Sequence, residues 1–416
     1  MDTYLINGGN KLHGERLLQG AKNASLPIIA ASILVDGISV ISRCPMISDT
    51  LAMKELLLVL GCNVSRNKNE LKIDSRTCIK DEIPEELMKE IRSSIVLMGP
   101  MLARHGRVKL THPGGCEIGA RPIDLHLNGL RQLGATITES HGYITCEASK
   151  LLGAEIDLDF PSVGATENIM LAATLADGIT IIRNAAREPE IIELQNFLNK
   201  SGAKIEGAGS NVIKIKGVSK LHDVVYEVGG DRIVAGTYFC AAAITGGEIL
   251  VRGIAPEYLR ATLHKLRESG CTVKLFDKED VLIKAPEKLK AVNVKTMPFP
   301  GFPTDMQSQM VTSLTLAQGT SIIMENIFEN RYKYVSELTK MGANITVEGK
   351  TAIVTGVDYI TGAAVESKEL RGGASLVLAG LAAEGLTKID GVHYIERGYE
   401  NFVENLKNIG ADISKK

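Results

Sequence analysis

The chain has 416 residues, of which 44% are hydrophobic and 23% are charged, and its formal net charge is −2. That length is too great for one ordinary core, so two domains of about 200 residues each are expected. The near-neutral charge gives no global attraction for nucleic acid or an anionic membrane, and no obligate protein partner is inferred. Aromatic residues make up 4% and tryptophan is absent, which disfavours a site built on stacking.

The sequence predicts a cytoplasmic protein with free thiols. No segment approaches the roughly 20 apolar residues of a membrane span, and the first residues lack the basic start of a secretory signal. The seven cysteines contain no C-x-x-C pair, so neither a disulfide framework nor a zinc site is expected. They are Cys44, Cys62, Cys78, Cys116, Cys146, Cys240 and Cys271.

A helix that ends in a glycine, followed by the start of a β-branched strand, recurs six times along the chain. Such a glycine suits the left-handed cap that ends a helix. The near-constant interval, 68 to 73 residues, predicts six related units. The six glycines are Gly61, Gly134, Gly202, Gly270, Gly342 and Gly410.

Each unit also has a first, more apolar helix, followed by a glycine and a strand. A helix that is apolar on all sides is expected to be buried. The second helix of a unit, such as Glu188–Ser201 or Ala255–Ser269, is amphipathic, and strands such as Thr180–Ile182 and Val212–Ile215 are short and β-branched. The six segments that contain the end of the apolar helix, the glycine and the strand are Ala30–Ile41, Met101–Leu110 (a more charged copy), Ala172–Ile182, Ala241–Val251, Leu314–Ile323 and Leu378–Ile389.

Six such units predict an α/β protein of two domains, three units in each, with apolar helices inside and sheets outside. A solenoid of six repeats is the alternative. The length of the units disfavours it, because solenoid repeats run about 20–50 residues.

The segment 111–125 interrupts this regular alternation of helix and strand, with four glycine or proline residues in its first nine positions. Glycines let backbone N–H groups crowd around an anion, and Arg121 offers a planar fork for phosphate or carboxylate. In that setting Cys116 is expected to favour the reactive thiolate, the alternative being a small buried side chain. The loop therefore predicts a site for phosphorylated, anionic small molecules.

Polar residues also lie where the apolar helices begin. A positive helix end attracts anions by about 0.3–1 kcal/mol when exposed, and several ends together dominate binding in a desolvated cleft. For Lys22 taken alone, an exposed helix-start lysine is an equal alternative. These residues are Lys22 with Asn23, Arg92, Ser162 to Gly164, Asp231 with Arg232, Asp305, and Glu369 with Arg371; Arg397 precedes the last helix.

Six phrases of the sequence resemble those of the enolpyruvyl transferases that use UDP-N-acetylglucosamine. The sister family that makes enolpyruvylshikimate phosphate shares the six-unit fold but lacks the cysteine loop. The phrases are G-A-K-N-A at Gly20–Ala24, P-G-G-C-x-I-G-x-R-P at Pro113–Pro122, S-V-G-A-T at Ser162–Thr166, A-A-R-E-P-E at Ala185–Glu190, F-P-T-D-M-Q at Phe302–Gln307 and I-F-E-N-R at Ile327–Arg331.

The resemblance implies two inside-out α/β barrel domains around a closing cleft, one spanning 22–229 and the other 1–21 with 230–416. It also implies transfer of the enolpyruvyl group of phosphoenolpyruvate to the 3′-hydroxyl of UDP-N-acetylglucosamine, with release of phosphate. This is the first committed step of peptidoglycan synthesis. Neither a metal nor a cofactor is implied, because arginines and a lysine supply the positive charge.

The resemblance assigns the catalytic positions to Cys116, Asp305, Lys22 and Arg397. Cys116 would protonate C3 of phosphoenolpyruvate and can add to C2, and it would be the target of the epoxide antibiotic fosfomycin. Asp305 would take the proton of the attacking hydroxyl, and Lys22, Arg121 and Arg397 would hold the anionic groups. The other substrate-binding positions are Asn23, Arg92, Pro122, Ile123, Asp124, Leu125, Ser162, Val163, Gly164, Ile327, Arg331, Glu369 and Arg371.

Two positions depart from the family pattern, since Glu369 and Glu396 stand where Asp is usual. A carboxylate longer by one methylene can shift a contact by ~1 Å, which is enough to affect the rate. These departures are the only support for an alternative, a non-catalytic paralogue that binds UDP-N-acetylglucosamine and regulates wall synthesis. Cys116 disfavours the other alternative, a shikimate-pathway transferase.

Overall fold

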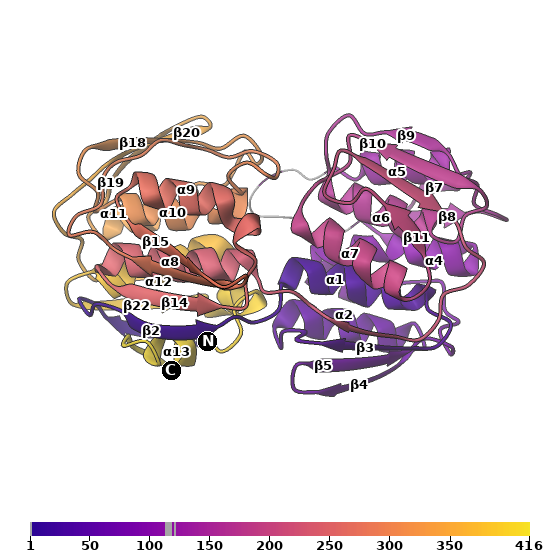
Figure 1. The fold of residues 1–416 in the computed structure, drawn as a ribbon, viewed down its shortest axis with the longest axis horizontal. Helices are drawn as coiled ribbons and strands as arrows, with labels where there is room; N and C mark the ends of the chain where they lie inside the picture. The colour runs from indigo at the N-terminus through magenta and orange to yellow at the C-terminus, as the bar shows by residue number, and fades with distance from the viewer. Residues whose placement is uncertain (1, 113–118, 120–121) are drawn as a thin grey trace. The chain divides into compact units, whose positions relative to one another are not determined.

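The computed structural model describes residues 2–112, 119 and 122–416 of the chain. The contacts divide these residues into two compact units. The first unit comprises 20–112 and 122–229, and the second comprises 2–19, 119 and 230–416. Figure 1 labels their helices and strands.

The first unit contains three sheets among its described residues, with strand orders β13-β3-β5-β4, β6-β8-β7 and β11-β12-β10-β9. Its strands are β3 (Ile38–Ser42), β4 (Asn63–Asn67), β5 (Glu70–Asp74), β6 (Arg107–Thr111), β7 (Thr136–Ser140), β8 (Tyr143–Glu147), β9 (Glu155–Asp157), β10 (Ile179–Arg183), β11 (Lys204–Glu206), β12 (Val212–Lys216) and β13 (Val224–Glu227). Its helices are α1 (Lys22–Ala31), η1 (Ser32–Leu34), α2 (Ser48–Val59), α3 (Glu85–Glu90), η2 (Arg92–Leu97), α4 (Met98–His105), α5 (Asp124–Gln132), α6 (Val163–Ala173) and α7 (Pro189–Lys200).

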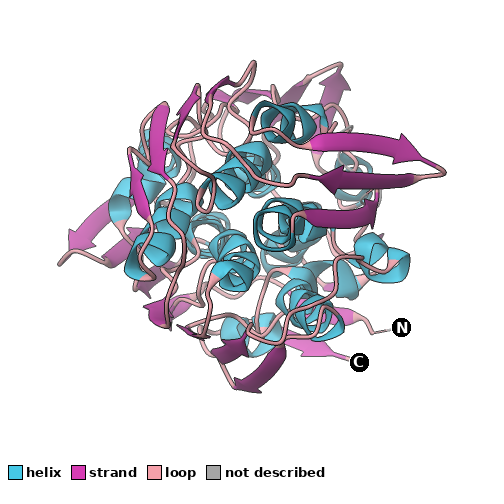
Figure 2. Ribbon diagram, turned by 90° about the vertical axis from the view of Figure 1, so that its right-hand side faces the viewer, coloured by secondary structure: helices cyan, strands magenta, loops and turns pink. Residues whose placement is uncertain are grey.

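Nearly uniform apolar composition places α1 and α6 in the core of the first unit. All but one residue of α1, and nine of the eleven in α6, are buried, as the sequence predicted for such helices. The amphipathic helices α2, α5 and α7 bury one side only. Figure 2 shows the helices of this unit gathered between its sheets.

The second unit also contains three sheets, with strand orders β21-β22-β1-β23, β15-β16-β14-β2 and β17-β18-β20-β19. Its strands are β1 (Tyr4–Asn7), β2 (His13–Leu17), β14 (Glu248–Arg252), β15 (Thr272–Phe276), β16 (Asp280–Lys284), β17 (Val294–Lys295), β18 (Thr320–Met324), β19 (Asn344–Glu348), β20 (Thr351–Thr355), β21 (Ala364–Glu366), β22 (Leu386–Asp390) and β23 (Asp412–Lys415). Its helices are α8 (Arg232–Thr245), η3 (Pro256–Leu259), α9 (Arg260–Glu268), η4 (Thr304–Met306), α10 (Gln307–Leu314), α11 (Val335–Lys340), α12 (Leu370–Ala382), η5 (Val392–Arg397) and α13 (Phe402–Lys407).

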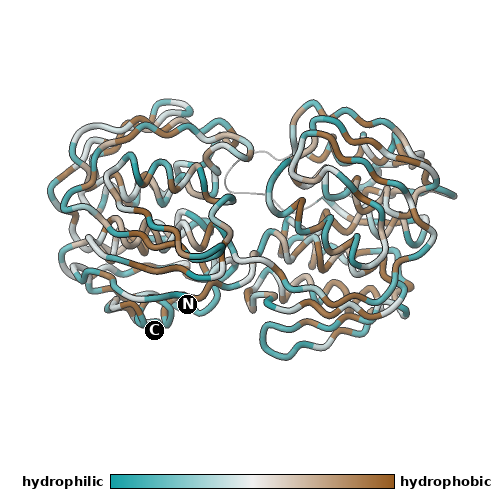
Figure 3. Tube along the Cα trace, in the orientation of Figure 1, coloured by the Kyte–Doolittle hydropathy of each residue, from teal (hydrophilic) through white to brown (hydrophobic). Residues whose placement is uncertain are grey.

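The three apolar helices of the second unit, α8, α10 and α12, pack against one another. Buried small residues such as Ala241, Ser313 and Ala379 line these helices and allow close packing. Figure 3 shows brown, hydrophobic stretches along the interior segments, whereas the hairpin of β4 and β5 is mostly teal.

The four-stranded sheets share one pattern of pairing. The strand that follows an apolar helix takes a parallel neighbour on one side and an antiparallel neighbour on the other. Thus β10 pairs in parallel with β9, with Ile182 opposite Ile156, and antiparallel with β12, with Ile182 opposite Ile213. In the sheet of β22, the antiparallel neighbour is β1 from the start of the chain, which also pairs with β23.

The six glycines of the repeat all have the left-handed backbone that was predicted for them, with φ between 93° and 107°. Each lies between a helix and a strand, for example Gly202 between α7 and β11. A side chain at Gly61 would also meet the carbonyl oxygen of Thr77 at 2.8 Å.

One predicted helix, 255–269, differs in detail, because it begins as a 3₁₀ turn at Pro256 and becomes α-helical at Arg260. Within the part of the chain that the structure describes, no helix is long and apolar enough to cross a membrane.

Candidate functional site

In the first unit, the predicted phosphate-binding lysine opens α1. Lys22 is the first residue of the helix, and its Nζ lies 3.0 Å from Oδ2 of Asp49 on α2. Both side chains are largely buried, with exposed fractions of 11% and 3%. No side chain caps α1, so its first N–H groups keep the partial positive charge that attracts anions. Lys22 is therefore a buried, paired lysine and not the exposed one of the alternative interpretation.

Asp49→Asn should lower the free energy of unfolding by about 3–5 kcal/mol, because it removes one partner of a buried ion pair. Calorimetric unfolding of the purified variant measures this change. The matched control is Asp358→Asn, which makes the same substitution in the exposed pair with Lys288 and should leave the transition unchanged. Equal unfolding temperatures for all three proteins would show that the Lys22–Asp49 pair contributes nothing.

The predicted nucleotide-sugar positions of the first unit lie at the starts of three helices. Ser162 is the N-cap of α6, and its Oγ accepts a hydrogen bond from the N–H of Ala165 at 3.3 Å, as predicted for a capping hydroxyl. Arg92 opens η2 and Asp124 opens α5. Pro122 is exposed, and Ile123 and Leu125 pack against the core of the unit.

His126, which the sequence analysis did not single out, joins these helix starts. It follows Leu125 on α5, is 7% exposed, and lies within electrostatic reach of Arg92 and Asp124. A Cβ built on Gly164 would fall 3.2 Å from its Nε2. Burial lowers the pKa of His126 to about 4, and the positive charge of Arg92 adds to that effect. The structure thus brings Arg92, Asp124 and Gly164 together around a neutral histidine.

Two central predictions fall outside the described residues. Cys116 and Arg121 belong to the stretches 113–118 and 120–121, so their surroundings are not part of the structure. The six other cysteines are all buried and free.

In the second unit, Asp305 lies on η4 just before α10, and two buried arginines hold its carboxylate. Nη2 of Arg331 lies 2.9 Å from Oδ1, and Nη2 of Arg371 lies 3.1 Å from Oδ2. Both arginine side chains are 2% exposed, whereas the Asp305 side chain is 27% exposed. Only the aspartate of the trio therefore presents much surface to a substrate. Arg331 and Arg371, predicted to bind substrate, are in contact with Asp305.

Polar and aromatic neighbours fix Arg371 in turn. Its guanidinium carbon lies 5.5 Å from the ring centre of Tyr399, whose hydroxyl is 2.9 Å from Oγ1 of Thr237. Burial by itself would lower the pKa of Arg371, but Tyr399, Asp305 and Asp231 together raise it above the usual arginine value. Arg371 therefore stays charged beside Asp305 at any accessible pH.

A fully buried carboxylate, Glu325, links two of the predicted phrases. Its Oε2 accepts from Oγ1 of Thr304, next to Asp305, at 2.9 Å. Its Oε1 accepts from the backbone N–H of Ile327 at 2.8 Å. Glu325 is not among the residues predicted from the sequence, although a carboxylate directly after an alternating strand, and close before the I-F-E-N-R phrase, is a usable signal. It positions both the predicted base and the predicted nucleotide-sugar contact at Ile327.

The two departures from the family pattern have defined places. Glu369 is half-buried and caps α12, with Oε2 accepting from the N–H of Arg371 at 2.7 Å and Oε1 accepting from that of Gly372. Glu396 accepts from the hydroxyl of Tyr4 at 3.2 Å and pairs with Lys415 at 2.5 Å. The longer Glu369 still reaches the N–H groups of the helix, and Glu396 joins the first and last strands. Arg397 is half-buried at the end of η5.

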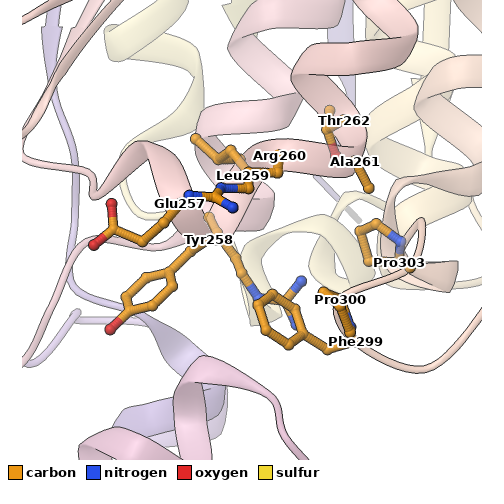
Figure 4. Close-up of a pocket in the computed structure, with 11 residues that line it drawn as sticks. Glu257, Tyr258, Leu259, Arg260, Ala261, Thr262, Phe299, Pro300 and Pro303 are labelled. Carbon is orange, nitrogen blue, oxygen red and sulfur yellow. The ribbon is translucent and has the colours of Figure 1, made fainter. Parts of the chain in front are cut away.

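Two surface hollows of the second unit contain none of the residues predicted to act in catalysis or substrate binding, but Arg232, one of the polar residues predicted at helix starts, lines the smaller one. Figure 4 shows the smaller one. Its volume is about 10 Å³, and the guanidinium carbon of its lining residue Arg232 lies 5.8 Å from the ring centre of Phe299. A space of that size holds at most one water molecule. The larger one, about 420 Å³, lies between α9 and the strands β17 and β18. Its apolar lining residues are Val294, Met297, Phe302, Ile322 and Met324.

Comparison with known proteins identifies the family. The family model described as EPSP synthase (3-phosphoshikimate 1-carboxyvinyltransferase) matches residues 6–406. The chain is 54% identical to UDP-N-acetylglucosamine 1-carboxyvinyltransferase 2 of Caldanaerobacter subterraneus subsp. tengcongensis, with 99% of each chain covered. It is 52% identical to UDP-N-acetylglucosamine 1-carboxyvinyltransferase 1 of Symbiobacterium thermophilum, covering all of this chain and 95% of the relative.

Solved structures show the same fold at low sequence identity. The enolpyruvyl transferase NikO from Streptomyces tendae superposes with a TM-score of 0.90 at 24% identity, covering 100% of this chain and 99% of that one. EPSP synthase from Acinetobacter baumannii gives 0.76 at 21% identity, with both chains fully covered. The match over nearly the whole length, together with the identities above 50%, shows that this chain belongs to the enolpyruvyl transferase (EPSP synthase) family.

Proposed function

We propose that this protein is an enolpyruvyl transferase that moves the enolpyruvyl group of phosphoenolpyruvate to the 3′-hydroxyl of UDP-N-acetylglucosamine and releases phosphate. The observation that carries the proposal is the 54% identity, over 99% of both chains, to a relative named for that activity. Peptidoglycan synthesis in the cytoplasm is the setting of this reaction, with the two small molecules as its only partners.

In the proposed mechanism, Asp305 takes the proton of the sugar hydroxyl as its oxygen attacks C2 of phosphoenolpyruvate. Cys116 delivers a proton to C3, which completes a tetrahedral adduct. The Cys116 thiolate then takes a proton back from C3 as the bond from C2 to the phosphate oxygen breaks, which releases phosphate and regenerates the enol ether. The contacts of Asp305 with Arg331 and Arg371 support its role, because they hold the carboxylate in one orientation.

Binding of the anionic groups falls to cationic residues and helix ends. We assign the phosphate and carboxylate of phosphoenolpyruvate to Lys22, Arg121 and Arg397. The uncapped start of α1, at Lys22 and Asn23, supports this assignment. The nucleotide sugar is assigned to Arg92, the stretch 121–125, Ser162 to Gly164, and Ile327.

We also propose that each unit is an inside-out α/β barrel of three repeated units, with domains at 22–229 and at 1–21 with 230–416. The buried apolar helices and the shared sheet pattern support the repeat. The pairing of β1 with β22 and β23 supports the assignment of the amino-terminal strand to the second domain.

Release of phosphate from the two substrates tests the proposed function directly. The purified protein should release phosphate only when phosphoenolpyruvate and UDP-N-acetylglucosamine are both present. Release with shikimate 3-phosphate in place of the nucleotide sugar would identify the shikimate-pathway alternative, for which the description of the family model is the support.

A protein that binds UDP-N-acetylglucosamine tightly but releases no phosphate would be the non-catalytic paralogue. The contacts of Glu369 and Glu396 weaken that alternative. Glu369 keeps both of its oxygens on helix N–H groups, and Glu396 pairs with Tyr4 and Lys415. Neither residue replaces a group assigned to proton transfer.

Fosfomycin should label Cys116 in preference to every other cysteine. The reason is the burial of the other six thiols, which are between 0% and 5% exposed. Burial also raises the pKa of Cys146 and Cys240 to about 12, which keeps their unreactive thiol form. Hydrogen bonds with Cys62 and His105 lower the pKa of Cys78 to about 5, so its protection rests on its burial alone. Mass spectrometry of the labelled protein locates the adduct, and an adduct mainly at Cys62 or Cys240 would contradict the prediction.

A further inference from the structure

His126 presents one edge of its ring to the start of α6. A Cβ built on Gly164 would fall 3.0 Å from Cε1 and 3.2 Å from Nε2 of the histidine. The opposite nitrogen, Nδ1, lies 2.7 Å from Nδ2 of Asn168, one turn further along α6. The two ring nitrogens therefore have different surroundings, one beside an amide and the other beside the predicted nucleotide-sugar positions.

The backbone determines which way the Asn168 amide points. Its Oδ1 accepts from the N–H of Gly99 at 2.7 Å, and its Nδ2 donates to the carbonyl oxygen of Ile95 at 3.0 Å. A backbone N–H can only donate and a carbonyl oxygen can only accept, so a flipped amide would lose both bonds. The group that faces His126 is therefore an NH₂ donor.

A donor from Asn168 requires an acceptor on His126. Nδ1 must carry a lone pair, and a neutral imidazole then has its proton on Nε2. Protonation of Nδ1 would place two donors 2.7 Å apart. The charged groups that face the ring are Arg92 from η2, which also opposes protonation, and Asp124 from α5 itself, which favours it. The burial of the ring outweighs Asp124, and the pKa of His126 falls to about 4.

Nε2 has no hydrogen-bond partner among residues 2–112, 119 and 122–416. The His126 side chain is nine-tenths buried, but Nε2 is not among the fully enclosed, unpaired atoms of the described residues, so a ligand oxygen can reach its proton and accept from it. It lies beside the first turn of α6, an 11-residue helix whose first N–H groups also lack partners within the helix. Donors from two different elements thus converge on one place.

We propose that Asn168 fixes His126 as a neutral donor, with its proton on Nε2, and that this donor binds an oxygen of the nucleotide sugar at the start of α6. The inference rests on the proposed function for the identity of the ligand. It adds His126 as a residue that recognises the ligand and Asn168 as the positioning residue that sets its proton. The acceptor is a phosphate oxygen or a uracil carbonyl oxygen, since both offer lone pairs without a proton.

Nitrogen NMR of histidine in the free protein tests the first half of the proposal without any ligand. The chain has eight histidines, and the His126 signals are those that disappear in His126→Gln. We expect the neutral Nε2–H tautomer throughout a titration from about pH 9 to about pH 6. A proton on Nδ1, or a midpoint at or above the ordinary histidine value of about 6.5, would overturn the inference.

Asn168→Asp replaces the NH₂ donor by an acceptor. His126 should then carry its proton on Nδ1, and its midpoint should rise by at least two pH units. The matched control is Asn128→Asp, which makes the same change at an exposed position of α5 and should leave the His126 tautomer as in the wild type. An unaltered tautomer in Asn168→Asp would overturn the positioning role, and if that variant does not fold the wild-type titration still decides.

Binding of UDP-N-acetylglucosamine by calorimetry tests the second half. His126→Phe should weaken binding about tenfold, the loss of one hydrogen bond, while His126→Gln keeps a donor and should restore most of it. In Asn168→Asp, affinity should improve as the pH falls from about 9 to about 6, because the charged ring regains its Nε2 proton. A merely structural role would not produce that pH dependence.

The affinities for UDP-N-acetylglucosamine, UDP and uridine distinguish the two possible acceptors. If His126→Phe loses the same factor in affinity for UDP and for uridine, the hydrogen bond is to uracil. If it loses affinity for UDP but not for uridine, the bond is to a phosphate. No loss for any of the three would overturn the recognition role. If wild-type protein fails to bind UDP-N-acetylglucosamine at all, the proposed function fails, whereas the tautomer of the free protein still stands or falls by its own measurement.

Discussion

Asp305→Asn should lower the kcat of phosphate release by about 10²–10⁴-fold, the usual contribution of a general base. An amide cannot accept the proton of the sugar hydroxyl. It has the same size, but its single oxygen can accept from only one of Arg331 and Arg371, and its NH₂ group faces the other guanidinium. The variant should therefore keep the fold and lose one contact at position 305, whereas the chemistry should not survive. Affinity for UDP-N-acetylglucosamine should change by much less than kcat.

The test compares steady-state kinetics of Asp305→Asn, Asp305→Glu and the exposed control Asp358→Asn. Asp305→Glu keeps the charge but moves it by about one methylene, so it should retain more activity than the amide if proton transfer is the role. Circular dichroism shows whether each variant is folded. A folded Asp305→Asn variant with kcat within a factor of three of wild type would rule Asp305 out as the base.

The two arginines explain why Asp305 is more than a surface carboxylate. Each guanidinium is almost fully buried, and the charges around it raise its pKa despite that burial. Such a pair holds the aspartate in one orientation. In the proposed mechanism, the hydroxyl loses its proton to this fixed carboxylate as its oxygen attacks.

The repeat in the sequence predicted most of the secondary structure, because it depends on local physics. A glycine after a helix allows the left-handed turn at Gly134 or Gly342 whatever the tertiary fold. Long apolar runs predicted which helices would be buried. The 3₁₀ turn before α9 was missed, since α- and 3₁₀-helical turns have nearly the same sequence preferences at a helix start.

Residues that open helices were also predictable, because capping is local. Ser162 and Glu369 each bond to N–H groups two or three residues away. Their distant partners were not predictable. Asp49 pairs with Lys22 across 27 positions, and Arg371 reaches Asp305 across 66.

The orientation of His126 depends in the same way on distant contacts. Asn168 lies 42 positions further along the chain, and its amide is in turn set by Gly99 and Ile95. Contacts between residues so far apart along the chain depend on how whole helices pack, which a single sequence does not reveal.

Cys116→Ser should reduce phosphate release by about 10²–10⁴-fold while leaving the affinity for UDP-N-acetylglucosamine nearly unchanged. A serine hydroxyl has a pKa far above that of a thiol, so it is a poor proton donor to C3 and is scarcely ionised for addition to C2. Cys271→Ser is the matched control, because it makes the same change at a buried thiol 3.9 Å from Ser269. The control should retain wild-type turnover.

Single-turnover kinetics separates the two tasks assigned to Cys116. If the thiol delivers the proton to C3, Cys116→Ser should slow both the first turnover and the steady state by the same factor. If it acts only through addition to C2, transfer from enzyme-bound phosphoenolpyruvate should proceed at the wild-type rate once, and only later turnovers should be slow. If Cys116→Ser has wild-type rates in both the single-turnover and the steady-state measurement, Cys116 takes no part in the chemistry. Asp305, Lys22 and the arginines would then have to account for catalysis.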